Sequence, residues 1–274
     1  NLFGSKRRMG MALGVQNLDD IGNRLSDMLK LEVPDSLMGK LAMLPMLKEM
    51  AGFPPRTVRS GPCQEVVLQG DEIDLGKLPV ITCWPDDGGP YITLPLVITK
   101  DLESGIRNVG MYRMQVYDPA STGMHWQIGK GGGFHYHVAE QRGDALPVTV
   151  FLGGPPALIL SAIAPLPENV PELMLASLIA GERLRLVEGV GPHPLVAGAE
   201  FALMGTVAPG TRRSEGPFGD HYGYYSLQHD YPVFEVQRMA RRHDAIFPAT
   251  VVGKPRQEDF FIGDLLQELL SPLF

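Results

Sequence analysis

Short β-branched or alternating segments, separated by Gly, Pro, Asp and Ser, fill most of the chain after residue 62. Such segments are typical of strands bounded by turns. Strands and helices do not alternate regularly, which does not favour a Rossmann fold. The pattern predicts an antiparallel α+β domain, a β-barrel or sandwich with peripheral helices. The strand candidates are residues 63–69, 91–99, 108–118, 122–129, 146–153, 184–190, 199–208, 233–242 and 246–253.

Helical patterns lie mainly at the two ends and in the middle of the chain. Residues 17–31 repeat apolar positions at helical spacing, and residues 35–50 form a second such segment that begins at Asp35 or Ser36. Prolines in the first turn favour another helix near residue 155. The remaining helix candidates are residues 137–143, 171–182 and 259–273.

Composition excludes some classes of protein. The chain has 274 residues and a formal net charge of −7, which argues against a general binder of nucleic acid or anionic membranes. Cys63 and Cys83 fit no CxxC pattern, so we expect free thiols and a reducing, cytoplasmic location. No apolar run reaches the roughly 18 residues of a membrane span.

The segment NVGMYRMQ, residues 108–115, carries an arginine on a predicted strand. Strand alternation places Arg113 on the face opposite to Asn108 and Tyr112. Burying an arginine is costly unless an acid meets it, and Glu215 and Asp220 are candidates. The alternative is a solvated arginine at the end of a strand.

The segment SEGPFGDHYGYYS, residues 214–226, places two carboxylates five positions apart around a Gly–Pro turn. Two close acids repel each other, so burial can keep one protonated near neutral pH while an arginine holds the other ionised. Glu215, Asp220 and Arg113 could therefore form an acid–base relay. The alternative is a turn capped by Asp220, with a solvated Glu215.

The segment MHWQIGKGGGFHYH, residues 124–137, combines three consecutive glycines with three histidines. Residues 131–133 would let the backbone approach a ligand closely, and Lys130 could meet a phosphate. A hairpin loop is the alternative for the glycines. His125, His135 and His137 could bind a metal or stack on a cofactor.

Glu172 follows Pro171 at the start of a predicted helix. An acid in the first turn interacts favourably with the helix dipole, which explains Glu172 without any ligand. Together with Asn108, it would also make a hard-oxygen site suited to Mg²⁺ or Mn²⁺, if the fold brings the two together.

Four segments, in this order along the chain, resemble the UbiD family of decarboxylases, which use prenylated FMN. They are NVGMYRMQ, LPVTVFLGGPPALILSA, PLPENVPE and EGPFGDHYGYY. The likeness runs from NLFGSKRRMGMALG at the first residue through RRHDAIFPATVVGKP to the last helix. It implies a split β-barrel of the FMN-binding type with peripheral helices.

The resemblance also implies an organisation in three parts. These are a helical N-terminal segment at residues 1–60, a barrel that binds prenylated FMN at 61–258, and the start of a linking helix at 259–274. Family members are longer at both ends. The full-length protein is expected to be a homo-oligomer, a dimer or hexamer, supplied with cofactor by a prenyl-flavin synthase.

The resemblance assigns roles to individual residues. Asn108 and Glu172 match Mn²⁺ ligands that hold the flavin phosphate, and a K⁺ ion is expected near main-chain carbonyls of residues 162–164. Where many relatives have a histidine as third metal ligand, this chain has Gly129. The positions that match cofactor contacts are Met111, Tyr112, Arg113, His125, Trp126, Gln127, Lys130 and Gly131.

The activity implied is the reversible, non-oxidative decarboxylation of an aromatic, heteroaromatic or α,β-unsaturated carboxylic acid. Asp220 would be the proton donor, and Glu215 would pair with Arg113 and tune it. Two alternatives remain. One is a flavin-binding or assembly subunit without turnover. The other is a cupin-like metalloprotein, since GKGGGFHYHVAE matches the cupin pattern at Gly129, His135 and His137, while its glutamate comes one residue early.

Overall fold

The computed structural model describes residues 2–29, 36, 52–127, 129, 131–166 and 171–270. The helix predicted for residues 35–50 lies outside the described residues. Two compact units make up the chain. The helical unit comprises Asn1–Arg56, Pro156–Leu184 and Glu258–Phe274, and the sheet unit comprises Thr57–Pro155 and Arg185–Gln257. The three-part division predicted from the sequence stays a prediction.

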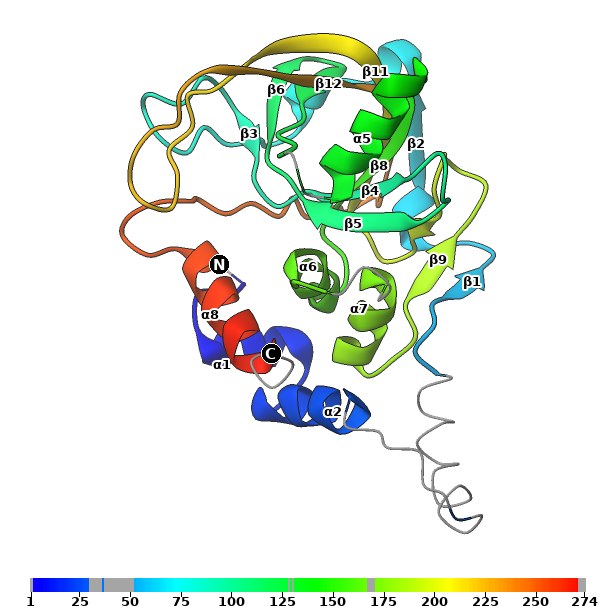
Figure 1. Ribbon diagram of the computed structural model, residues 1–274, viewed down its shortest axis with the longest axis vertical. Coiled ribbons are helices and arrows are strands. Elements are labelled where there is room, and N and C mark those ends of the chain that lie inside the picture. Colours follow the sequence, from blue (N-terminus) through cyan, green and yellow to red (C-terminus); the bar gives the residue numbers. More distant parts are fainter. Residues whose placement is uncertain are drawn as a thin grey trace. The chain divides into compact units, whose positions relative to one another are not determined.

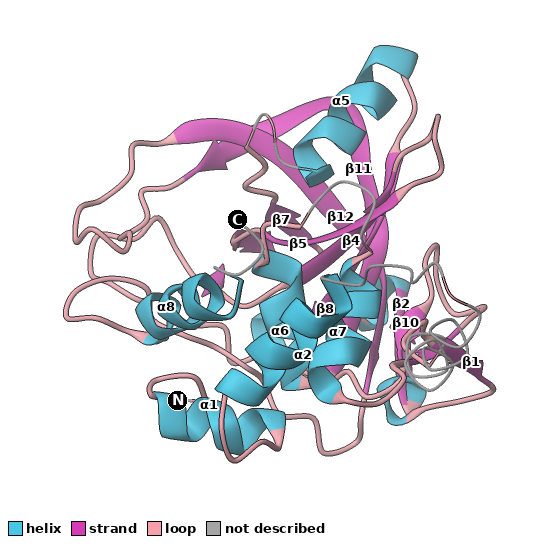
Figure 2. Ribbon diagram, turned by 60° about the horizontal axis from the view of Figure 1, so that its bottom comes forward, coloured by secondary structure: helices cyan, strands magenta, loops and turns pink. Residues whose placement is uncertain are grey.

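The sheet unit is built on one antiparallel sheet that curls around a core (Figures 1 and 2). Its strands are β2 (Val66–Gln69), β3 (Tyr91–Ile92), β4 (Leu96–Lys100), β5 (Arg107–Met111), β6 (Met114–Asp118), β7 (Ser121–Gly123), β8 (Leu146–Leu152), β11 (Phe201–Glu215) and β12 (His229–Arg241). Eight strands follow the order β3-β6-β7-β12-β11-β8-β4-β5, and β2 pairs with β12. The predicted α+β fold is confirmed.

The long hairpin of β11 and β12 forms the middle of this sheet. Its register runs from the pair Phe201 and Arg241 to the pair Glu215 and His229, with irregularities after Met204 and after Val207. Residues 211–214 are exposed, whereas Glu215 at the end of the strand is buried. The side chain of Glu215 is therefore buried within the unit, although the four residues before it on the strand are exposed to solvent.

Helix α5 (Gly131–Arg142) packs on the sheet against β4, β5, β8 and β11. Its buried Tyr136 lies beside Trp126, with ring centres 5.3 Å apart, within the hydrophobic core that the inner sheet residues form. Burial of side chains of this size contributes roughly 1.5–3 kcal/mol each. The core thus fixes the segment between β7 and α5, which contains several predicted cofactor contacts.

The structure differs from the predicted elements at several places. The strand expected over residues 91–99 is two strands, β3 and β4, and the strand expected over residues 122–129 ends at Gly123. Residues 131–133 begin a helix, so neither the hairpin loop nor a helix restricted to residues 137–143 is right. The single strand expected over residues 108–118 is two strands, separated by Tyr112 and Arg113. Residues 246–253 form no strand, because they run through turns and irregular backbone.

A smaller three-stranded sheet contains β1 (Arg56–Val58), β9 (Arg185–Val187) and β10 (Leu195–Val196), in the order β1-β9-β10. In β9 and β10 the register pairs Leu195 with Val187 and Val196 with Leu186. All four of these apolar side chains are buried.

The helical unit contains α1 (Lys6–Leu13), α2 (Asp19–Leu29), α6 (Pro156–Ile163), α7 (Glu172–Ala180) and α8 (Glu258–Leu270). Ser5 caps α1 by accepting a hydrogen bond from Arg8 N, and Glu258 at the start of α8 accepts one from Phe3 N at 2.6 Å. The predicted helices near residues 155, 171 and 259 are confirmed. Within the described residues, no helix combines the length and the apolar character needed to cross a bilayer.

Candidate functional site

A buried ion pair joins the connection between β5 and β6 to the end of β11. Arg113 Nε donates to Glu215 Oε1 at 2.8 Å, and Arg113 Nη2 donates to Oε2 at 3.2 Å. The Glu215 side chain is 1% exposed and that of Arg113 is 17% exposed. Two parallel hydrogen bonds to one carboxylate are the strongest arrangement available to an arginine. The alternatives of a solvated arginine and a solvated Glu215 are wrong.

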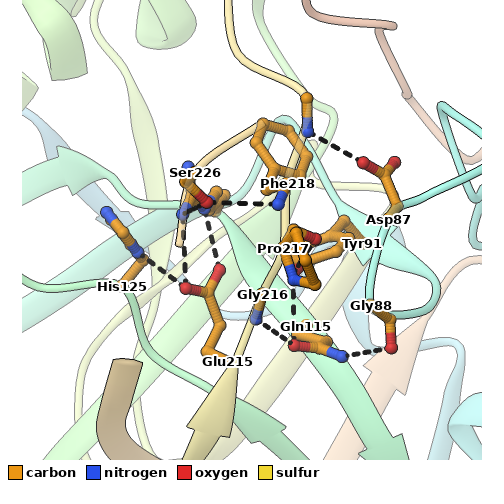
Figure 3. A network of polar contacts seen from close by, with 12 residues as sticks. Asp87, Gly88, Tyr91, Gln115, His125, Glu215, Gly216, Pro217, Phe218 and Ser226 are labelled. Carbon is orange, nitrogen blue, oxygen red and sulfur yellow. Dashed lines mark hydrogen bonds and ion pairs between the residues drawn. The ribbon is translucent and has the colours of Figure 1, made fainter. Parts of the chain in front are cut away.

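His125 binds the same carboxylate from the other side. Its Nδ1 lies 3.0 Å from Glu215 Oε2, and its backbone N–H donates to the carbonyl of Arg113 at 3.3 Å. The imidazole also stacks on Tyr231 of β12, with ring centres 4.3 Å apart. The segment after β7 thus runs beside the segment after β5, and each directs a side chain at Glu215. Figure 3 shows His125 beside the carboxylate of Glu215.

These contacts determine the ionisation of Glu215. Burial raises the pKa of its carboxyl group, but hydrogen bonds from His125 and Arg113 and their charges outweigh burial and bring the pKa below its usual value. Glu215 is therefore an anion at neutral pH. Burial and the Glu215 charge raise the pKa of Tyr91, Tyr231 and Tyr117, the last to about 12, so these phenols are neutral.

The turn after Glu215 is held by polar contacts that the sequence did not reveal (Figure 3). Gln115 Oε1 accepts from Gly216 N at 2.9 Å, while its Nε2 donates to Gly88 O at 2.7 Å. Asp87 Oδ1 accepts from Gly219 N at 2.8 Å. A Cβ on Gly88 would lie 2.1 Å from Gly216 O, so only glycine permits this approach.

The residues of this turn also cover Arg113. The Phe218 ring lies with its centre 4.4 Å from Arg113 Cζ, and Tyr91 packs against Phe218 at 4.6 Å between centres. Ser226 Oγ lies 3.4 Å from Arg113 Nη2 and accepts from Phe218 N at 3.1 Å. Phe218 and Ser226 thus lie against the guanidinium of Arg113. The sequence did not indicate four residues of this site, which are Gln115, Asp87, Tyr91 and Ser226. Its one signal for any of them was the pair of acids before Gly88 in PDDGGP, residues 85–90.

Asp220 takes a different position from Glu215. Its carboxylate accepts a hydrogen bond from Tyr222 N at 2.8 Å, inside its own turn, as the capping alternative expected. Among the described residues, no hydrogen bond or ion pair joins Asp220 to Arg113 or Glu215. The structure therefore brings two members of the predicted relay together, with His125 as their neighbour, and the proton-donor role of Asp220 stays a prediction.

A second group of predicted residues meets at the start of α5. Tyr112 OH accepts from Gly132 N at 3.1 Å and from Asn108 Nδ2 at 3.3 Å. The rings of Tyr112 and Trp126 meet edge to face, 6.5 Å apart. A Cβ on Gly131 would lie 2.1 Å from Asn108 Oδ1, so a glycine at this position lets the first residue of α5 approach β5.

The other predicted positions are less informative. Met111 is half-buried at the end of β5, Gln127 is exposed, and Lys130 lies outside the described residues. Glu172 begins α7 in the helical unit, whereas Asn108 lies on β5 in the sheet unit, and their pairing on a metal stays a prediction. Gly129 is exposed with φ +90°, a backbone conformation that a histidine adopts only with strain.

The cupin-like alternative required His135 and His137 to share a metal. His135 is buried with Nδ1 2.8 Å from Thr99 Oγ1, whereas His137 is exposed, on the same helix. Within the part of the chain that the structure describes, no group of three or more His, Cys, Asp or Glu could hold a metal ion. The two histidines therefore do not form a cupin centre.

A curled antiparallel sheet, a helix that packs on it and a buried arginine–carboxylate pair define an α+β class of protein. Comparison with known proteins identifies this class. Residues 56–255 match the family described as UbiD, the 3-octaprenyl-4-hydroxybenzoate carboxy-lyase Rift-related domain. The chain belongs to the UbiD family, as the resemblance implied.

Relatives in Chlamydia match along the whole chain. A protein of Chlamydia trachomatis serovar D is 49% identical over 281 residues, which cover 100% of this chain and 47% of that protein. A 4-hydroxybenzoate decarboxylase subunit of Chlamydia pneumoniae is 45% identical over 289 residues, covering 100% and 46%. The chain spans about half the length of these relatives.

Solved structures of the same class share the fold. An evolved dimeric form of the UbiD-class enzyme HmfF from Pelotomaculum thermopropionicum, in complex with prFMN, has a TM-score of 0.80 at 28% identity, covering 97% of this chain and 57% of that chain. The closed form of vanillic acid decarboxylase from Sedimentibacter hydroxybenzoicus has a TM-score of 0.81 at 26% identity, covering 95% and 53%.

Proposed function

We propose that this chain is the flavin-binding part of a decarboxylase that removes CO₂ from an aromatic, heteroaromatic or α,β-unsaturated carboxylic acid with prenylated FMN. The buried pair of Arg113 and Glu215 carries the proposal. It places a fixed cation and a fixed anion in a family whose member HmfF is solved with prFMN.

The residues at the start of α5 fit a phosphate-bearing aromatic cofactor. Gly131 and Gly132 admit no Cβ without collision, because Asn108, Tyr112 and Trp126 pack directly against this helix N-terminus, which is a position where anions bind favourably. Among the described residues, the buried Trp126 Nε1 has no hydrogen-bond partner, which leaves a donor for a ligand. Asn108 and Tyr112 add polar groups beside it.

Prenylated FMN, when bound, supplies an electron sink for the electron pair that remains on carbon as CO₂ leaves. The protein supplies orientation and proton transfer. Within the described residues, Nη1 of Arg113 has no hydrogen-bond partner, so the guanidinium can bind an anionic oxygen while its other edge stays on Glu215. Asp220 donates the proton that replaces the carboxyl group. Phe218 excludes water from one face of Arg113.

Asn108 and Glu172 would contribute oxygen ligands to a Mn²⁺ ion that binds the flavin phosphate, with K⁺ as a second ion. Oxygen ligands of this kind suit Mn²⁺. Elemental analysis of purified Glu172→Ala against the wild type tests the ligand role: the proposal predicts loss of manganese, and equal manganese in both proteins contradicts it.

Turnover separates the proposal from a non-catalytic subunit. The protein is produced together with a prenyl-flavin synthase and mixed with hydroxybenzoates, heteroaromatic acids and acrylic acids while released CO₂ is measured. Release from at least one acid supports the decarboxylase. Stoichiometric flavin without CO₂ from any acid supports the binding subunit instead.

A further inference from the structure

His125 is held by three different elements at once. Glu215 of β11 binds its Nδ1, Tyr231 of β12 stacks on its ring, and the carbonyl of Arg113 binds its backbone N–H. The side chain is 16% exposed. A residue in a connecting segment that is fixed in this way has one ring orientation, so its two nitrogens have different environments.

The contact with Glu215 defines which nitrogen carries the hydrogen. Two hydrogen bonds from Arg113 keep the carboxylate ionised, and an ionised carboxylate only accepts. The hydrogen between Glu215 and His125 therefore belongs to Nδ1. The other nitrogen, Nε2, points away from Glu215 in Figure 3 and has no hydrogen-bond partner among the described residues.

We infer that Glu215 and His125 form a carboxylate–imidazole dyad in which Nε2 of His125 gives up and takes back a proton within the site. The bond from Nδ1 to Glu215 exists in both the neutral and the charged ring. Proton exchange at Nε2 therefore leaves the ring, Glu215 and Arg113 in place, which is the arrangement that a proton-transfer histidine requires.

The use of this proton in the reaction rests on the proposed function. Decarboxylation of a carboxylate to R–H and CO₂ consumes one proton per turnover. Asp220 gives that proton to carbon, and the charged His125 releases its Nε2 proton to the site to replace the proton that Asp220 has lost. His125 then becomes the neutral Nδ1–H form and regains a proton from water. One C–C bond is broken, one C–H bond is formed, and no oxidant or reductant is needed.

The charged and titratable groups around the dyad are few. Glu215 and Arg113 face the imidazole as an anion and a cation, from β11 and from the connection between β5 and β6. Tyr231 faces it from β12, and Tyr91 and Tyr117 interact electrostatically with Glu215. Burial raises the pKa of these three phenols, so they stay neutral at neutral pH.

Nitrogen-15 spectra of the histidine rings in the chain without cofactor test the dyad. We expect His125 to be the Nδ1–H form when neutral, because Nδ1 lies 3.0 Å from Glu215 Oε2, and we expect the Nδ1 signal to shift in Glu215→Gln. The signals of His137, exposed on α5, serve as the control and should not move. A neutral ring protonated at Nε2, or a His125 Nδ1 signal that is unchanged in Glu215→Gln, overturns the inference.

Two substitutions separate proton exchange from mere support of Glu215. His125→Asn puts an amide N–H near the position of Nδ1 and so keeps the donor to Glu215, but it has no exchanging nitrogen. His125→Leu removes both. In the cofactor-loaded protein we expect kcat to fall about 10²-fold in His125→Asn, with loss of the pH dependence of kcat that His125 causes.

Folding and activity are read separately. We expect the melting temperature of His125→Asn to stay near that of the wild type and that of His125→Leu to fall. Wild-type kcat and an unchanged pH profile in His125→Asn overturn the role in proton transfer. Because the spectra need no turnover, they decide the dyad even if the loaded wild type decarboxylates no acid, a result that would contradict the proposed function alone.

Discussion

Phe218 covers one face of the Arg113 guanidinium, whose Cζ lies 4.4 Å from the centre of the ring, while the edge of the same group binds Glu215. A cation above an aromatic face is attracted to it, and more strongly where water is excluded. Phe218 of the GPFGD turn therefore helps to hold the ion pair of Arg113 and Glu215 in a sheltered position.

Glu215→Gln should reduce the free energy of unfolding by about 3 kcal/mol at pH 7, because it leaves Arg113 and His125 without their anion. Since the pKa of Glu215 is lowered by folding, its stabilisation is present above its ordinary pKa of 4.5 and is lost as pH falls through the lower folded value. Urea unfolding at a series of pH values measures both effects.

The matched control for this substitution is Glu235→Gln, on the exposed face of β12. It should change stability by less than about 0.5 kcal/mol. Equal effects of the two substitutions at pH 7, or a Glu215→Gln deficit that persists unchanged to pH 3, would show that the ion pair does not stabilise the fold as described.

Gln115→Leu should destabilise the sheet unit by about 1–3 kcal/mol, because Gly216 N–H and Gly88 O lose their partners in a buried position. Gln237→Leu, exposed on β12, is the control. Denaturant midpoints provide the comparison. If the two variants unfold at the same denaturant concentration, Gln115 is not the residue that holds the turn.

Gly131→Ala should weaken binding of FMN, because the new Cβ would lie 2.1 Å from Asn108 Oδ1 and must displace either the strand or the start of α5. Gly263→Ala on α8 meets nothing within 4 Å and should leave affinity unchanged. Fluorescence titration with FMN measures the two dissociation constants. Unchanged affinity in Gly131→Ala would remove the start of α5 from the cofactor site.

Asp220→Asn should abolish release of CO₂ while flavin remains bound, because Asn keeps the acceptor for Tyr222 N but cannot donate a carboxyl proton. The loaded variant is assayed for CO₂ and for flavin absorbance in the same sample. Wild-type turnover would exclude Asp220 as the proton donor and leave His125 as the candidate for that role.

Local patterns predicted most of the strands and the helices near residues 155, 171 and 259. Because a buried arginine needs an acid, they offered Glu215 and Asp220 as partners of Arg113, and the resemblance to the UbiD family selected Glu215, which the structure shows. The start of α5 could not be predicted, because three glycines have low helix propensity and become helical only through packing on Asn108 and Trp126.

The neighbours of the ion pair could not be predicted for a different reason. Gln115 and Asp87 act through backbone groups of residues 88 and 216–219, and no residue type in the sequence signals a backbone partner that is 101 or 132 positions away. The break between β5 and β6 is similar, since NVGMYRMQVYD alternates without interruption and only the pairing of β3 with β6 and of β4 with β5 divides it.

The most direct test of the central claim is the native mass spectrum of the chain produced together with a prenyl-flavin synthase. A modified flavin seated on the sheet unit predicts one prenylated FMN per chain in the wild type, and its loss from Gly131→Ala. A wild-type chain that carries no flavin under these conditions, or an equal load in both proteins, would contradict the claim that the start of α5 seats the cofactor.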